Sequence, residues 1–289
     1  MLVDESGKPV ESAGDGIPEL TDRQRQEAED RTSVAAVVVH EAIRKDGEEE
    51  LRRPASALAW SGLAAGLSMG FSFLGQALFR TYLPDAKWRP LIASLGYPLG
   101  FLIVIIGRQQ LFTENTLTAI IPLLARRNLT TLASVLRLWT VVLVANLIGA
   151  HLFAWVIAYT PVLGPEFQTS LRQIAEKAAA VSFGVAVLRG IFAGWLIAMV
   201  VWMLAATDSA HVPIIVILTY IVGLANLTHI VAGSVEVLFL VMAGAKSWWS
   251  FACGYMIPAL IGNIIGGVSL VSALNHAQVI AGAQRAASR

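Results

Sequence analysis

The stretches LFTENT (residues 111–116) and LTHIV (residues 227–231) each interrupt an apolar segment that is too long for a single membrane crossing. The first segment covers about residues 91–124 and the second covers about residues 212–242. A helix needs roughly 20 apolar residues to cross a bilayer. Polar backbone at membrane depth is tolerated only where protein buries it or where it lines a cavity. Since interrupted helices at matching positions in two halves of a chain are typical of transport sites, these stretches predict the centre of a transport pathway.

The composition predicts an integral membrane protein with helical spans, and so an all-α fold. Hydrophobic residues make up 56% of the 289 residues and charged residues only 14%, whereas a soluble domain carries about 25% charged residues. The formal net charge is +1 and no basic cluster is present, so nothing indicates a nucleic-acid partner. Cys253 is the single cysteine, which excludes an internal disulfide.

The chain divides into three predicted parts. Residues 1–53 form a cytoplasmic amino-terminal tail with a short helix, residues 54–276 form a six-span channel domain, and residues 277–289 form a cytoplasmic carboxy-terminal tail. Six spans place both termini on one side of the membrane, and a small excess of Lys and Arg there favours the cytoplasm. The predicted spans cover about residues 55–78, 91–124 with a break near 108–116, 131–157, 184–205, 212–243 with a break near 225–231, and 249–274.

An internal repeat relates the two halves of the predicted domain. Asn146-Leu-Ile-Gly149 matches Asn263-Ile-Ile-Gly266 at an offset of 117 residues. The two interrupting stretches match at an offset of 116, and glycines 62 and 66 match glycines 190 and 194 at an offset of 128. Each half holds three spans, an odd number, so the halves are expected to be inverted relative to each other in the membrane. Glycines four residues apart let helix backbones approach closely in lipid.

Two polar residues stand at the predicted centre. His229 lies at mid-membrane, where ionisable groups are rare and functional, so we expect a proton donor or an anion contact. The other interpretation is a neutral histidine that is hydrogen-bonded within a helix break. Thr113 is the expected hydroxyl partner of the His229 stretch across the repeat axis, or else it satisfies a carbonyl that the break leaves free.

Three charged residues, Arg108, Glu114 and Glu236, lie in or beside the predicted spans. We expect them to form structural ion pairs, within one subunit or across a subunit contact. The sequence contains no nucleotide-binding loop, no cluster of metal ligands and no spacing that indicates a nucleophile, histidine and acid. It therefore predicts neither an enzyme nor a bound cofactor or metal.

The chain resembles the formate/nitrite transporter family. The resemblance covers about residues 40–280 and rests on the Leu-Phe-Thr-x-Asn-Thr break, the central histidine, and Asn-x-x-Gly in spans three and six. Each motif alone is weak, but the combination is specific. The charged lead-in to Arg53 and the run from Gly107 to Thr116 look most like the divergent YfdC-like bacterial branch of that family.

The resemblance implies an aquaporin-like inverted 3+3 repeat in the bacterial inner membrane, assembled as a homopentamer with one pore in each protomer. It implies transport of small monovalent anions or their weak acids, such as formate, nitrite or hydrosulfide, linked to a proton through His229. It also implies roles for further residues. These are Leu111, Phe112 and Thr113 in the first break, Tyr97, Phe101 and Val222 at constrictions, Thr228 beside the histidine, and Lys177 in the outer vestibule.

Two departures from the family pattern leave other functions open. Thr228 stands where formate and nitrite members usually have an acid, and Gly194 and Gly233 stand where they have asparagines. If these glycines widen and depolarise the centre, the pore is a channel for a small neutral solute without proton coupling. A further alternative is a non-transporting membrane scaffold or sensor that uses the acidic amino-terminal tail.

Overall fold

The computed structural model describes residues 34–279, apart from the side chains of residues 270 and 271. Most of the predicted amino-terminal tail and most of the predicted carboxy-terminal tail therefore lie outside the described residues. All regular secondary structure within the described residues is helical. The elements are α2 (Ala36–Arg52), α3 (Ala55–Tyr82), α4 (Arg89–Ala93), η1 (Ser94–Gly96), α5 (Pro98–Ile106), α6 (Asn115–Thr118), α7 (Ile120–Arg126), α8 (Leu129–Tyr159), α9 (Pro165–Ala179), α10 (Phe183–Leu204), α11 (His211–Leu224), α12 (Ala232–Met242), α13 (Trp248–Phe251), η2 (Ala252–Met256), α14 (Ile257–Ile264) and η3 (Ile265–Ala273).

Five of the described helical stretches are long and apolar enough to cross a membrane. The predicted fifth span instead corresponds to two shorter apolar helices, α11 and α12, with non-helical backbone between them. Span two is divided in the same way, since α5 ends at Ile106 and α6 begins at Asn115. The helix breaks predicted near residues 108–116 and 225–231 are therefore confirmed.

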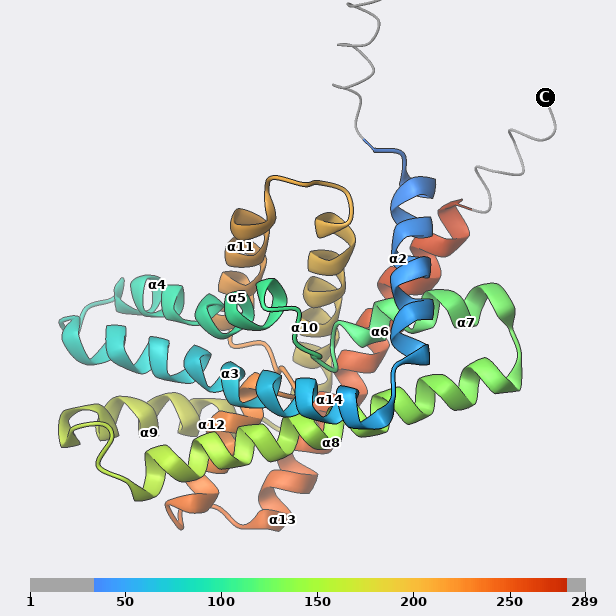
Figure 1. Cartoon of the computed structure of the whole chain (residues 1–289). Helices are drawn as coiled ribbons and strands as arrows, with labels where there is room; N and C mark the ends of the chain where they lie inside the picture. The colour runs from blue at the N-terminus through green and yellow to red at the C-terminus, as the bar shows by residue number, and fades with distance from the viewer. Residues whose placement is uncertain (1–33, 280–289) are drawn as a thin grey trace, which may run out of the picture. The chain divides into compact units, whose positions relative to one another are not determined.

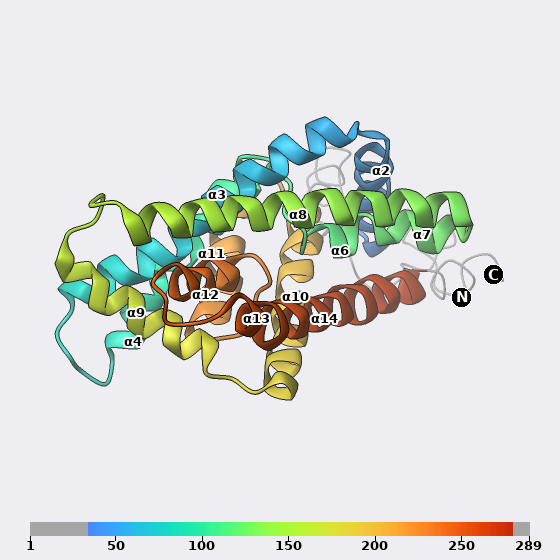
Figure 2. The same ribbon diagram turned by 90° about the horizontal axis from the view of Figure 1, so that it is seen from below.

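Two helix pairs form the frame of the molecule. Figures 1 and 2 show α3 lying along α8, and α10 lies against α14 and η3. A methyl group on Gly66 would overlap the carbonyl of Asn146, and one on Gly194 would overlap the carbonyl of Asn263. The predicted close packing at these glycines is confirmed. The expectation that Gly194 widens the centre is wrong, because the backbone of α14 fills the space beside it.

Both breaks begin with the same backbone turn. Arg108 and Asn226 adopt left-handed conformations, with φ of 53° and 52°. The next amide in each break, Gln109 or Leu227, donates to a carbonyl of the preceding helix at 2.9 and 3.0 Å. The breaks therefore correspond residue by residue when Arg108 is paired with Asn226. The predicted offset of 116 for the interrupting stretches is wrong by two residues, because it matched the letters of the stretches and not the turns that precede them.

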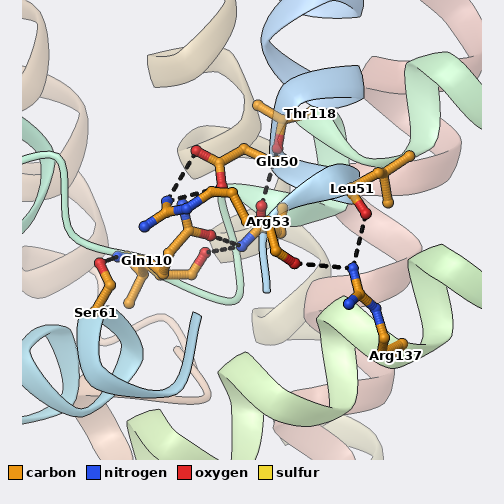
Figure 3. Close-up of polar contacts among 9 residues, drawn as sticks. Glu50, Leu51, Arg53, Ser61, Gln110, Thr118 and Arg137 are labelled. Carbon is orange, nitrogen blue, oxygen red and sulfur yellow. Dashed lines mark hydrogen bonds and ion pairs between the residues drawn. The ribbon is translucent and has the colours of Figure 1, made fainter. Parts of the chain in front are cut away.

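Helix α2 is held against the helices that follow the first break. A methyl group on Gly47 would overlap the carbonyl of Thr118, so the backbone of α2 lies directly on α6. Glu48 forms an ion pair with Arg126 at 2.8 Å. At the carboxyl end of α2, Arg137 of α8 donates to the carbonyls of Leu51 and Arg53 at 2.7 and 3.1 Å (Figure 3). Contacts with several elements therefore fix the position of α2.

Candidate pore centre

The centre of the site is a hydrogen bond between the two breaks. Thr113 Oγ1 lies 2.9 Å from His229 Nε2, and both side chains are completely buried. Thr113 lies just before α6, and His229 lies just before α12. The predicted contact between Thr113 and His229 is confirmed.

The backbone around His229 determines which ring nitrogen carries a proton. The amides of Val231 and Ala232, at the start of α12, both donate to Nδ1, at 3.3 and 3.1 Å. Nδ1 therefore acts as an acceptor, and the proton of the neutral ring lies on Nε2. It follows that His229 donates its Nε2–H to the hydroxyl oxygen of Thr113. This arrangement matches the interpretation of a neutral histidine that is hydrogen-bonded within a helix break.

Two asparagines hold the breaks in place through the same set of bonds. Asn146 Oδ1 accepts from the amide of Phe112 at 2.9 Å, and its Nδ2 donates to the carbonyls of Gly62 and Gln110. Asn263 Oδ1 accepts from Ile230 at 2.8 Å, and its Nδ2 donates to Gly190 and Thr228. Because both side chains are fully buried, each asparagine satisfies an amide and a carbonyl of its break, which no regular helix would satisfy, and ties the break to a carbonyl of α3 or α10.

A network of hydrogen-bonded side chains further stabilises the first break. Ser61 Oγ accepts from the amide of Gln110 at 3.1 Å (Figure 3). The side-chain amide of Asn115 donates to the side-chain oxygen of Gln110 at 3.0 Å, and Thr118 donates to Asn115. The indole of Trp139 in α8 donates to the carbonyl of Asn115. Residues from α3 and α8 thus fix the backbone that presents Thr113.

Buried aromatic and aliphatic side chains lie in the same core as the central pair. The ring of Phe101 meets the ring of His229 edge-on, with centroids 5.1 Å apart, and Tyr97 packs on Phe101 at 5.4 Å. Val222 and Leu111 are also completely buried. The ring of Phe112 packs against Trp139 of α8 at 5.6 Å. The structure therefore brings Phe101, Tyr97 and His229 into one aromatic cluster, whereas the side chain of Phe112 points toward α8.

Tyr255 occupies the space that Gly233 was expected to open. A methyl group on Gly233 would overlap the hydroxyl of Tyr255, which donates to the carbonyl of His229 at 3.2 Å. The expectation that Gly233 widens the centre is therefore wrong. Thr228 is engaged as well, since its hydroxyl donates to the carbonyl of Ala186 in α10 at 2.7 Å.

Two cavities lie toward opposite ends of α10 and α11. The α2-side cavity has a volume of about 430 Å³. The α9-side cavity is about 20 Å³, room for about one water molecule. Thr113 and His229 line neither, so buried side chains separate the two cavities. The α2-side cavity is lined among others by Glu50, Arg108, Gln110, Glu114, Asn115 and His211, and the α9-side cavity by Gln76, Tyr97, Arg189, Val222, Glu236 and Tyr255.

The charged residues do not pair as expected. Among the described residues, no ion pair involves Arg108, Glu114 or Glu236. The expectation of ion pairs within one subunit is therefore wrong for the described chain. Lys177 is exposed on α9 and does not line the α9-side cavity, which Arg189 of α10 lines instead.

Comparison with known proteins identifies the family. The family model described as formate/nitrite transporter matches residues 37–277. The chain belongs to the formate/nitrite transporter family. It is 41% identical to the inner membrane protein YfdC of Escherichia coli over 251 residues, which cover 87% of this chain and 81% of that protein. It is 26% identical to the formate channel BtFdhC of Bacillus thuringiensis over 239 residues, or 81% of this chain and 91% of that protein.

Solved structures show the same fold. One, described as a pentameric formate channel with formate bound, has a TM-score of 0.67 and 21% identity, covering 78% of this chain and 98% of that one. Another, described as an FNT family ion channel, has a TM-score of 0.70 and 17% identity, covering 81% and 96%. The resemblance predicted from the motifs is confirmed, and the chain is a membrane protein of a transporter family.

Several residues of this formate/nitrite transporter family member escaped prediction from sequence. Asn146 and Asn263 were recognised only as markers of the repeat and of the family, although a buried amide in an apolar span must find hydrogen-bond partners. Arg189 stands in span four between apolar residues, a cation whose position alone indicates function. Nothing in the sequence indicated a role for Tyr255, because its contact with Gly233 depends on how span six packs against α12.

Proposed function

We propose that this protein is a channel for small monovalent anions that cross as their neutral weak acids, with the proton linked to His229. The observation that carries the proposal is the Thr113–His229 hydrogen bond, which stands between two cavities in a chain of the formate/nitrite transporter family. Formate is the first substrate to test, because relatives named as formate channels share the fold.

The proposed architecture has six spans in an inverted 3+3 repeat. The matched bonds of Asn146 and Asn263, and the matched turns at Arg108 and Asn226, support the repeat. Residues 54–276 form the channel domain between the two tails. The likeness to a pentameric formate channel supports a homopentamer, and the relation to YfdC supports the bacterial inner membrane. We place both termini in the cytoplasm, so the α2-side cavity faces the cytoplasm and the α9-side cavity faces outward.

The energetics favour passage of the neutral acid. An isolated anion in surroundings of low dielectric costs tens of kcal/mol by simple solvation estimates. Protonating an acid with a pKa of about 4 at pH 7 costs roughly 4 kcal/mol. Because Phe101 packs on His229, and Leu111 and Val222 are completely buried apolar side chains of the same core, the neutral acid has by far the lower barrier.

The central pair acts as a gate in this mechanism. Both side chains are completely buried, so a solute passes only when the Thr113–His229 bond opens. The Nε2–H that is released then donates to an oxygen of the solute, and the hydroxyl of Thr113 offers a second contact. Lys177 and Arg189 attract the anion toward the α9-side cavity before it is protonated.

Transport by the purified protein in lipid vesicles tests the proposal. Formate, nitrite, hydrosulfide and acetate are offered with and without an inward proton gradient. We expect gradient-dependent uptake of at least one of them, and a loss of that uptake in His229→Ala. The matched control is His151→Ala, which removes a histidine of α8 that lines neither cavity. Wild-type rates in His229→Ala from pH 5 to pH 8 would refute the mechanism.

A channel for a small neutral solute is the second candidate. The α2-side cavity favours it, since its lining includes Asp46, Glu49, Glu50 and Glu114 but only one arginine, Arg108. Such a lining attracts anions poorly. Proton coupling separates the two candidates, because a neutral solute moves at a rate that is independent of the proton gradient. If no solute moves through a folded oligomer, the scaffold or sensor function becomes the working hypothesis.

A further inference from the structure

Glu236 is a buried carboxyl group that the central pair does not use. It lies in the second turn of α12, is 6% exposed, and lines the α9-side cavity with Tyr97 and Val222. Within the described residues it makes neither a side-chain hydrogen bond nor an ion pair. A solute in this cavity therefore lies beside both the carboxyl group and Tyr97, before it reaches Phe101 and His229.

A purely structural role does not account for Glu236. Ionisable residues inside membrane proteins usually pair with an opposite charge, and a buried carboxylate without such a pair costs several kcal/mol. The protomer itself covers the side chain, with α8 and α9 packed on α12, so Glu236 does not lie on a surface where a neighbouring subunit would pair with it. Glu236 is thus a carboxyl group whose burial costs free energy and which lies at the edge of a cavity, and this combination points to a role in transport.

The groups that face Glu236 come from several elements. Tyr97 and Tyr255 line the same cavity, and Tyr255 connects it to His229 through the bond to the His229 carbonyl. Arg189 of α10 lines the cavity, and the positive charge of Lys177 on α9 acts on the carboxyl group. Arg189 therefore places a positive charge in the same cavity as the carboxyl group, and Lys177 adds a second cation on the neighbouring helix.

We propose that Glu236 is the proton donor and acceptor of the α9-side cavity. The inference rests on the proposed function. The protonated carboxyl of Glu236 gives its proton to the entering anion, which leaves a carboxylate and the neutral acid, and the carboxylate regains a proton from the solution on that side. One anion and one proton enter together, and the steps reverse for export. The neutral acid then continues past Tyr97 and Phe101 to His229.

Equilibrium exchange of labelled formate across vesicle membranes at equal internal and external pH tests this role. The flux through protein-free vesicles is subtracted, and the result does not depend on the orientation of the protein. We expect Glu236→Gln to lower exchange about a hundredfold at pH 8, the lower end of the range of general acid–base catalysis, and to leave it near the wild-type rate at pH 5. At pH 5 the solution itself supplies more of the neutral acid. Glu236→Asp keeps a carboxyl group and is expected to keep the wild-type pH profile.

The control is Glu176→Gln, which removes an exposed carboxyl group on α9 that does not line the cavity. A wild-type pH profile in Glu236→Gln overturns the proposal. A uniform loss at all pH values in both Glu236→Gln and Glu236→Asp also overturns it, because that result indicates a structural role. If the wild-type protein exchanges none of the proposed anions, the proposed function itself fails. Wild-type exchange with an unchanged Glu236→Gln profile refutes only the role of Glu236.

Discussion

Asn263 offers the sharpest test of how the breaks are held open. Its side chain makes three buried hydrogen bonds, one from the amide of Ile230 and two to the carbonyls of Gly190 and Thr228, at 2.8 to 2.9 Å. Each buried bond contributes about 1 kcal/mol net, so Asn263→Ala is expected to cost about 3 kcal/mol. For a domain of this size, that corresponds to a fall in melting temperature of roughly 6–12 °C.

The assay is thermal unfolding of the purified protein in detergent, with the Asn146→Ala variant measured beside it. Asn146 makes the same three bonds in the other half, so we expect a shift of similar size. The control is Ile261→Ala, which shortens a side chain of α14 that is 39% exposed on the outside of the protomer, and its shift should be small.

Asn263→Asp separates hydrogen bonding from packing. The substitution keeps the shape of the side chain but turns a carboxylate oxygen toward the carbonyls of Gly190 and Thr228, where Nδ2 now donates. We expect a loss at least as large as that of Asn263→Ala. Melting temperatures of both Asn263 variants close to that of Ile261→Ala would refute the reasoning, because they would mean that the break does not depend on these bonds.

Two further predictions concern α2. Gly47→Ala should displace α2, because the new methyl group overlaps the carbonyl of Thr118, and limited proteolysis should then cut the helix faster than in Gly184→Ala, a change that meets nothing within 4 Å. The pKa of His40 is lowered below its usual 6.5, first by burial and then by His276, whose Nδ1 lies 2.9 Å from His40 Nε2. Because the fold favours neutral His40, its stabilisation of α2 is full above about pH 6.5 and is lost as the pH falls through the lowered pKa. Amide exchange in α2, corrected for intrinsic rates, should rise at low pH, and a pH-independent rate would contradict this.

The sequence predicted the fold where local patterns determine it. The length of the apolar segments, the polar interruptions and the glycine spacing of four were sufficient to locate the breaks and the close helix pairs. The contact between Thr113 and His229 also followed from sequence. The predicted offset was two residues in error, but this did not matter because the breaks meet at the centre of the protein.

Contacts that depend on tertiary packing could not be predicted from the sequence. Gly233 was expected to open space, yet the hydroxyl of Tyr255 fills it, and no local pattern links a glycine in α12 to a tyrosine in span six. Glu236 was expected to pair with a cation, but the structure encloses it beside a cavity instead. Burial and pairing of a charged side chain depend on elements far apart in the chain, so its position within a span could not distinguish these outcomes.

The correspondence between the two breaks explains why the proposed pore contains one central histidine and not two. The bonds of Asn146 and Asn263 pair Gln110 with Thr228 and Phe112 with Ile230, so the position equivalent to His229 is Leu111. What the two breaks share, an asparagine and a left-handed turn, holds the backbone open. The two breaks differ at one central position, which is Leu111 in the first break and His229 in the second, and only the histidine can form a hydrogen bond with a solute. Thr113 has no hydroxyl counterpart, because Val231 stands at its equivalent position, and it therefore bonds across the centre to the histidine of the other half.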